Sequence, residues 1–119
     1  MSDYTIKHVD ELEHPYPNWI LCRKPLGLQS FGMNITELKP GEQIPEHDET
    51  GRNQEEVFIT LAGSPTIVID GEEHPAPEGT FVRLATEPKR YVINNGDGVA
   101  RVLIVSAPTT SGYEPMDWA

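Results

Sequence analysis

The residues best suited to chemistry in this sequence are its four histidines and its single cysteine. His47 lies in the acidic stretch 46–49, where a histidine can serve as a metal ligand or simply form part of a pocket wall. His8, His14 and His74 have no ligand spacing, and we interpret all three as surface or loop residues. We find no Ser-His-Asp set, phosphate-binding loop or cysteine cluster that would offer a competing mechanism.

The chain is strongly acidic, with 9 Lys and Arg residues against 19 Asp and Glu residues and a formal net charge of -10. A field of this sign repels phosphate backbones, and the sequence has no basic patch with interleaved aromatic residues. We therefore expect no nucleic-acid partner. We interpret the acidity as a means of staying soluble, with an acidic docking surface as the alternative.

Length and cysteine content predict one cytoplasmic domain over residues 1–119. A chain of 119 residues can bury a core without disulfides. Cys22 has no partner for an intramolecular disulfide, which is typical of a reducing compartment, and we expect it to pack as a small apolar group. The first residues lack the apolar run of a signal peptide, and no segment approaches the roughly 20 apolar residues of a membrane span.

The elements that must position these residues are short apolar runs between turn residues, a pattern that favours strands. Asp70-Gly71 between two runs predicts a hairpin, because both central residues of that turn need positive φ. Residues 95–98, Asn-Gly-Asp-Gly, predict the last hairpin. The expected strands are Thr5–Leu12, Trp19–Arg23, Phe31–Leu38, Val57–Leu61, Thr66–Ile69, Phe81–Leu84, Tyr91–Ile93 and Val99–Val105.

About eight short strands with Pro- and Gly-rich turns predict an all-β sandwich or barrel rather than alternating strands and helices. The jelly roll is one closed form of this kind. No linker or repeat divides the chain. The tail 109–119 contains Tyr113 and Trp118, so we expect it to pack on the barrel or on a second subunit.

One stretch of the chain resembles the first motif of the cupins. In that family a glycine, five residues and then His-x-His precede a glutamate, which comes shortly before another glycine. Gly41, His47, Glu56 and Gly63 fall in this frame. Glu49 stands where the second histidine usually is, and the segment before Glu56 is longer than usual.

The second cupin motif is only partly present. The family usually has Gly-x5-Pro-x-Gly-x2-His-x3-Asn. Counted from Gly79, this chain has Ala85, Glu87, Arg90 and Asn94 at those positions, so the first glycine and the asparagine match and the rest do not. The resemblance identifies the chain as a small, single-domain cupin of the conserved-barrel type with a degenerate metal site, and it implies a jelly-roll β-barrel.

In the family, two histidines, a glutamate and a third histidine point into the barrel and hold a divalent metal. The matching positions here are His47, Glu49, Glu56 and Arg90. An arginine stays protonated and has no lone pair to donate, so Arg90 is not a metal ligand and would repel a cation. The resemblance thus implies a pocket in which Arg90 meets Glu49 or Glu56, binds it through two parallel hydrogen bonds, and keeps the carboxylates ionised in place of the metal.

Two alternatives remain for this pocket. A metal such as Zn, Fe, Mn or Ni could sit on His47, Glu49 and Glu56, with Arg90 turned away or neutralising an anionic substrate. Arg90 could instead be a solvated residue of a charged turn, and Glu56 a surface acid at a strand edge. Four strand residues could line the pocket or belong to the core: Phe31, Met33, Phe58 and Tyr91.

Three functions follow from these readings. The first is binding of a small polar or anionic molecule in the barrel without a metal, with Arg90 and His47 facing the ligand. The second is a metal-dependent enzyme of the dioxygenase or isomerase kind found among cupins. The third is a non-catalytic dimeric protein with a filled barrel that acts through its surface. The resemblance also implies a homodimer paired through an N-terminal strand, since pairing covers exposed sheet edges.

Overall fold

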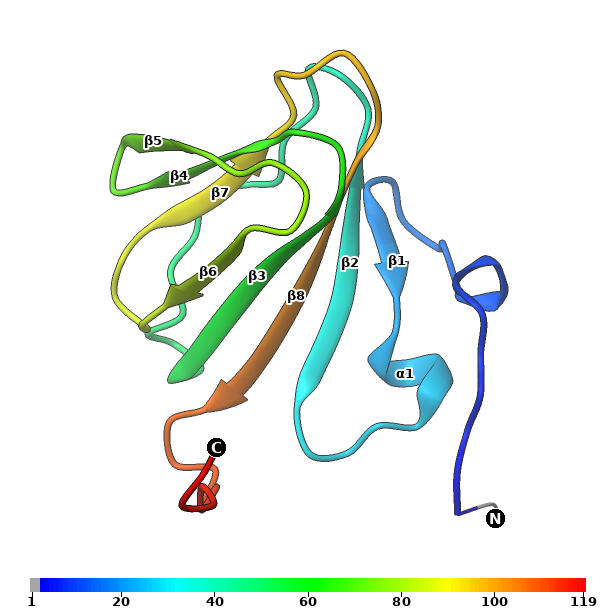
Figure 1. Ribbon diagram of the computed structural model, residues 1–119, viewed down its shortest axis with the longest axis vertical. Helices are drawn as coiled ribbons and strands as arrows, with labels where there is room; N and C mark the ends of the chain where they lie inside the picture. Colours follow the sequence, from blue (N-terminus) through cyan, green and yellow to red (C-terminus); the bar gives the residue numbers. More distant parts are fainter. Residues whose placement is uncertain (1–2) are drawn as a thin grey trace.

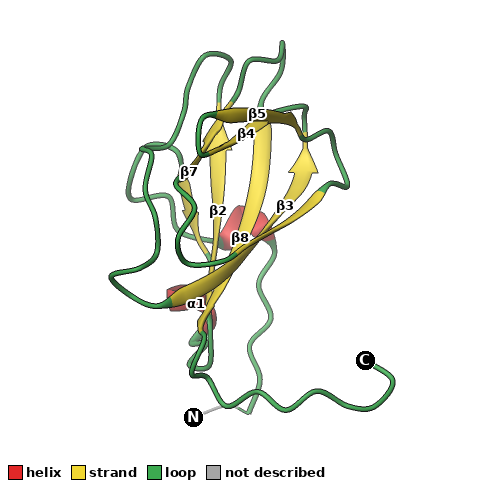
Figure 2. Cartoon of the chain, turned by 90° about the vertical axis from the view of Figure 1, so that its left-hand side faces the viewer, coloured by secondary structure: helices red, strands yellow, loops and turns green. Residues whose placement is uncertain are grey.

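The computed structural model describes residues 3–119, which form two antiparallel sheets that face each other (Figures 1 and 2). The five-stranded sheet has the order β1-β2-β8-β3-β6, and the three-stranded sheet has the order β5-β4-β7. The all-β jelly-roll prediction is confirmed. The elements are η1 (Val9–Glu11), β1 (Trp19–Leu21), α1 (Arg23–Leu26), β2 (Gly32–Leu38), β3 (Gln54–Ala62), β4 (Thr66–Ile69), β5 (Glu72–Pro75), β6 (Phe81–Leu84), β7 (Arg90–Ile93) and β8 (Ala100–Pro108).

The core lies between the two sheets and follows from the alternation of side chains along the strands. On β3, Glu56, Phe58 and Thr60 are buried, whereas the residues between them are partly exposed. A strand that turns one face inward shows this period of two. Both sheets supply apolar side chains to one cluster: Leu38, Ile44, Phe58, Ile67, Ala76, Leu84, Val92, Val102 and Ile104.

The Asp70-Gly71 hairpin is confirmed. It joins β4 to β5, which pair in register from Ile69 opposite Glu72 to Thr66 opposite Pro75. Asp70 has φ 49 and Gly71 has φ 80, so both central residues adopt the left-handed conformation that a tight two-residue turn requires.

The loop at residues 95–98 is not a hairpin, and that prediction is wrong. β7 pairs with β4, whereas β8 pairs with β2 and β3, so this loop crosses from one sheet to the other. The buried Asn94 fixes the crossing, because its Nδ2 donates to the carbonyls of Leu38 and Gly98 at 2.8 Å each. Turn residues reveal that the chain bends, and they carry no information about which strands pair afterwards.

The N-terminal region also differs from its prediction. Residues 5–12 form no strand, and the helix η1 occupies their second half. The His8 imidazole accepts a hydrogen bond from the Asp10 N–H, and the Glu11 carboxylate accepts one from the His8 N–H, so a capping box starts this helix. Past β1 the chain turns into α1, which ends at Gly27 with φ 73.

A second, smaller cluster lies on the outer face of the five-stranded sheet. Ile20, Cys22 and Ile35 are buried there, beneath partly buried side chains of the N-terminal segment and α1. Cys22 packs as a small apolar group, as predicted, and its burial raises the pKa of the thiol. Within the described residues, no helix is long and apolar enough to cross a membrane.

Candidate functional site

The site predicted from the cupin resemblance is assembled by the loop between β2 and β3, residues 39–53. This loop runs beside β7: the His47 N–H donates to the Arg90 carbonyl at 3.0 Å, and the Arg90 N–H donates to the His47 carbonyl at 2.8 Å. Nearer its start, the Ile44 N–H donates to the Val92 carbonyl at 3.0 Å. Pro45 interrupts this pairing because proline has no N–H to donate. His47 and Arg90 are therefore held directly opposite each other.

Arg90 is fully buried, with 0% of its surface exposed, and its guanidinium is almost completely hydrogen-bonded. Its Nε donates to Glu56 Oε1 at 3.2 Å. Its Nη1 donates to the carbonyls of Thr86 and Pro88, and its Nη2 donates to the carbonyl of Ala85. Four of the five N–H donors of a guanidinium are engaged in this way. Arg90 is therefore not a solvated turn residue. Its buried guanidinium holds the loop between β6 and β7 by binding the carbonyls of that loop.

The contact between Arg90 and Glu56 joins the two sheets, because Glu56 lies on β3 and Arg90 on β7. It has one hydrogen bond rather than the expected parallel pair, since the other N–H groups of the guanidinium bind loop carbonyls. Glu49 takes a different position: its backbone N–H donates to the Thr86 carbonyl at 2.9 Å. Of the two glutamates considered as partners of Arg90, Glu56 is the one that contacts it.

Burial raises the pKa of the Glu56 carboxyl, and the nearby negative charge of Glu49 raises it further. Arg90 and His47 act in the opposite direction without cancelling the rise. Arg90 therefore favours the ionised carboxylate, as expected, but its effect is smaller than that of burial, so the pKa of Glu56 is raised on balance. The physical reason is that the Glu56 side chain, only 7% exposed, loses nearly all of its hydration, and one hydrogen bond to a guanidinium does not replace it.

His47 connects this buried pair to solvent. Its Nε2 lies 3.9 Å from Glu56 Oε1, and its Nδ1 lies 3.1 Å from the Pro45 carbonyl, which orients the ring. Its side chain is 37% exposed and forms part of the wall of an open groove of about 460 Å³. The groove is lined by Trp19, Ile44, Pro45, His47, Asp48, Glu49 and Arg52.

The other predicted pocket residues do not line this groove. Phe58 is buried in the central core. Tyr91 lies between the buried Arg90 and Val92 on β7, is partly buried and packs against the central core cluster. Met33 packs with the outer cluster on β2. Strand alternation alone does not reveal which of its two faces is inside.

Sequence reasoning missed five residues of the groove: Trp19, Ile44, Pro45, Asp48 and Arg52. Asp48 stands between His47 and Glu49 and could have been included with them. The pKa of its carboxyl is lowered by hydrogen bonds from the hydroxyl and the N–H of Thr50. Trp19 is far away in the sequence, and only the pairing of β1 with β2 brings it to the barrel mouth.

Comparison with known proteins agrees with this architecture. The family model described as the cupin domain matches residues 34–106. The chain belongs to the cupin family. No protein with a curated description matches the sequence significantly.

Solved structures of other cupins have the same fold. A cupin protein from Bacteroides fragilis is 22% identical, covers 99% of this chain and 94% of its own, and has a TM-score of 0.80. A Cupin 2 conserved barrel domain protein from Salinispora arenicola is 23% identical over 92% of this chain and 93% of its own, with a TM-score of 0.72. A protein described as a sugar phosphate isomerase from a cupin superfamily, from Silicibacter pomeroyi, is 24% identical over 88% of this chain and 76% of its own, with a TM-score of 0.72.

The divalent metal that many cupins bind does not fit the residues of this site. Among residues 3–119, no group of three or more His, Cys, Asp or Glu side chains is arranged to hold a metal ion. Glu56 offers Oε1 to a guanidinium, and the position of the last family ligand is filled by a permanent cation. Every buried side-chain nitrogen and oxygen among these residues has a hydrogen-bond partner, so no orphaned donor or acceptor awaits an ion.

Proposed function

We propose that this cupin binds a small polar molecule at the mouth of its barrel, and that the Arg90 guanidinium takes the structural place of the family's metal. The observation that carries the proposal is the buried Arg90–Glu56 ion pair, in which the guanidinium has 0% and the carboxylate 7% of its side chain exposed. A second cation beside this guanidinium would be repelled strongly, because little water is present to screen the two charges. The degenerate metal site is then a permanent ion pair.

Arg90 acts as a positioning residue in this proposal and does not face the ligand. Its guanidinium holds Glu56 on one sheet, and its backbone pairs with His47, the residue that borders the groove. The earlier expectation of Arg90 as an anion-binding group is replaced for this reason. Ligand contacts are assigned to the groove residues His47, Glu49, Asp48 and Arg52.

The charges around the groove favour a neutral or cationic polar ligand over an anionic one. Two carboxylates, Asp48 and Glu49, line the groove, and Glu56 lies behind His47. The only positively charged side chain among the lining residues is Arg52, apart from a protonated His47. Carboxylates are hydrogen-bond acceptors, so they recognise hydroxyl and ammonium groups and repel other carboxylates. The indole of Trp19 adds an apolar wall of the kind that small-molecule sites commonly have.

A binding experiment tests this proposal. Neutral polyols, primary amines and monocarboxylates are titrated into the protein by calorimetry, with and without a strong chelator. We expect polyols or amines to bind, monocarboxylates not to bind, and the chelator to have no effect. His47→Ala and Glu49→Gln should weaken binding, while Glu46→Gln, an exposed acid of the same loop, serves as the control.

Two results would contradict the proposal. If the chelator abolished binding, a metal-dependent site and the enzyme alternative would take its place. If no class bound, the protein with a filled barrel would be the better account, because the central cluster already occupies the space between the sheets.

A further inference from the structure

The outer face of the five-stranded sheet carries apolar side chains open to solvent. Ile59 of β3 lies opposite Leu103 of β8 and opposite Phe81 of β6, so the three form one row across the sheet. Val57 and Val105 form a second row beside it. Phe81 is 70% exposed, and the other four are half-buried. The N-terminal segment and α1 cover the β1–β2 part of this face, and Leu103 of β8 packs against the cluster beneath them. The open part extends from Leu103 over β3 and β6.

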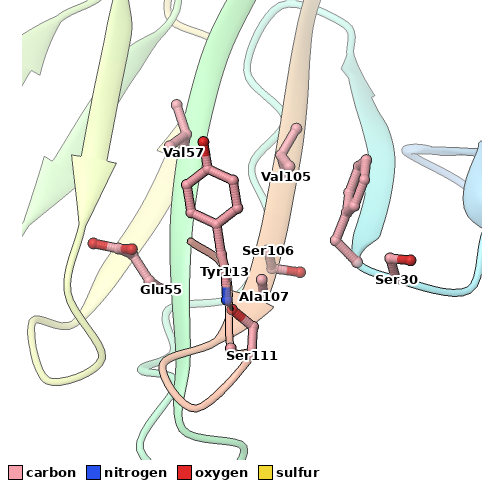
Figure 3. A pocket seen from close by; sticks show the side chains of 10 residues that line it. Ser30, Glu55, Val57, Val105, Ser106, Ala107, Ser111 and Tyr113 are labelled. Carbon is pink, nitrogen blue, oxygen red and sulfur yellow. Dashed lines mark hydrogen bonds between the residues drawn. The ribbon is translucent and has the colours of Figure 1, made fainter. Parts of the chain in front are cut away.

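A cleft of about 450 Å³ deepens this face where β3 begins and β8 ends. Its lining includes Val57, Val105, Phe31 and Glu55, together with Tyr113 of the C-terminal tail. Figure 3 shows the Tyr113 ring in front of β3 and β8, with Val57 and Val105 on either side. The cleft is therefore mostly apolar and separate from the groove beside His47.

The tail that borders the cleft carries large apolar side chains with almost no contacts of their own. Residues 108–119 are all exposed, with Tyr113 at 77%, Met116 at 65% and Trp118 at 84%. Past β8 the chain runs away from the sheets (Figure 2). Aromatic side chains usually bury 150–250 Å² each. The tail thus carries an apolar surface for which the barrel of its own chain offers little cover.

Charge on this face does not oppose contact with an identical face, although the whole chain has a formal charge of -10. Arg83 is paired with Glu55 at 2.6 Å, and Arg101 is paired with Glu37 at 2.7 Å. The face is therefore locally neutral. The tail 109–119 has two acidic residues and no Lys or Arg, so it meets a face on which Arg83 is already paired with Glu55.

We infer that a second copy of this chain packs on the outer face, related by a twofold axis, with the tail of each copy crossing the cleft of the other. Trp118 and Met116 of one tail then cover Val57 and Val105 of the other copy. A twofold arrangement uses the same patch twice, which suits a molecule that carries both an apolar cleft and an apolar arm. This interface differs from the N-terminal strand pairing that the family resemblance implies.

The areas are consistent with a role for the tail. Two strands of nine residues, β3 and β8, and one of four, β6, at about 4.8 Å spacing and about 3.3 Å per residue, project roughly 350 Å². This is less than half of the ~800 Å² per partner of a standard interface. Burying two aromatic side chains of the tail adds about 300–400 Å². The face alone is too small for a stable dimer, whereas the face together with the exchanged tail reaches the usual size.

Size-exclusion chromatography with light scattering tests the inference on the full chain, at low and high micromolar concentration. We expect a dimer that Phe81→Glu and Trp118→Ala each weaken by about tenfold or more, as for central apolar anchors. Val99→Glu is the matched control: Val99 is 48% exposed but precedes β8 at the end opposite the cleft. A monomer at high concentration, or a dimer unaffected by both variants, would overturn the inference.

Fluorescence gives a second readout that does not depend on hydrodynamic size. In the variant Trp19→Phe, Trp118 is the remaining tryptophan, so its emission should move to shorter wavelength as the protein is concentrated. A long-chain fatty acid serves as the competing occupant. If it binds the monomer at the cleft and the emission of Trp118 ignores protein concentration, the cleft serves an apolar ligand and the inference fails.

Discussion

The barrel interior and the outer face of the five-stranded sheet reverse the usual distribution of polarity in this protein. Inside, a permanently charged Arg90 is fully buried among carbonyls and one carboxylate. Outside, Phe81 and Trp118 are 70% and 84% exposed. Each region departs from the rule that charges face water and large apolar side chains avoid it.

The difference lies in where each region finds its partner. The buried guanidinium is satisfied within its own chain, by Glu56 and by three carbonyls of the loop before β7. The exposed apolar side chains have no comparable burial in the described chain, and the partner proposed for them is a second copy. The interior contacts therefore affect the free energy of unfolding of one chain, whereas the exterior side chains affect the association of two chains.

The largest expected effect comes from removing the interior cation. Arg90→Met leaves Glu56 buried without its ion-pair partner and leaves the loop carbonyls without donors. We expect a loss of about 3–5 kcal/mol in the free energy of unfolding, typical of a broken buried ion pair. Urea unfolding followed by circular dichroism measures it.

An exposed ion pair of the same residue types is the control for that change. Arg83→Met removes the ion pair with Glu55, in which the two side chains are 66% and 48% exposed. We expect this change to lower the free energy of unfolding by less than about 1 kcal/mol. Equal losses for the two arginines would erase the contrast between buried and exposed ion pairs on which this comparison rests.

The next effect concerns the outer face. A dimer that unfolds to monomers is stabilised by mass action, by about 2.7 kcal/mol when the concentration reaches roughly 100 times Kd. The midpoint of thermal unfolding should therefore rise with protein concentration, and Trp118→Ala should remove most of the rise. A midpoint independent of concentration in the unmodified protein would mean that the exposed side chains have no partner in a second copy.

A smaller effect is expected in the pH dependence of stability. Because the pKa of Glu56 is raised on folding, the folded state keeps this proton at pH values where the unfolded chain has released it. The free energy of unfolding should therefore fall as pH rises from about 4.3, the ordinary glutamate value, through the folded pKa. Glu56→Gln should flatten this fall and Glu55→Gln should preserve it; an unchanged slope in Glu56→Gln would show that Glu56 is not its source.

The smallest effect separates two carboxyl groups near one loop. Thr50 donates to Asp48 through its hydroxyl at 2.8 Å and its N–H at 3.2 Å, and both bonds lower the pKa of Asp48. Thr50→Val removes the hydroxyl and should raise the pKa of Asp48 while leaving Glu56 unchanged. Carboxyl carbon shifts in an NMR titration measure both groups; a lower pKa for Glu56 than for Asp48 would contradict the assignment.

The sequence predicts the fold well where a signal is local. Asp70-Gly71 specifies its own turn, and β4 and β6 have the predicted bounds, Thr66–Ile69 and Phe81–Leu84. The sequence fails where the partner is distant. Asn95–Gly98 has the composition of a hairpin, yet β8 pairs with β2 and β3, a choice made by packing across the whole barrel.

The candidate site divides in the same way. The cupin motifs indicate His47, Glu56 and Arg90, and the structure brings these three together. The motifs do not reveal that loop carbonyls accept most of the hydrogen bonds of the Arg90 guanidinium. Every residue type has a backbone carbonyl, so the sequence does not show which carbonyls will accept these bonds. Trp19 escapes prediction because only strand pairing carries it to the groove.

The central claim is that Arg90 stands in place of a metal ion, and metal titration of the protein and of Arg90→His tests it most directly. Both are freed of metal by a chelator, dialysed, and titrated with Zn, Mn, Fe and Ni salts, with bound metal measured by elemental analysis. We predict no tight site in the unmodified protein and about one equivalent in Arg90→His, since imidazole is a metal ligand and guanidinium is not. One equivalent of tightly bound metal in the unmodified protein would contradict the account.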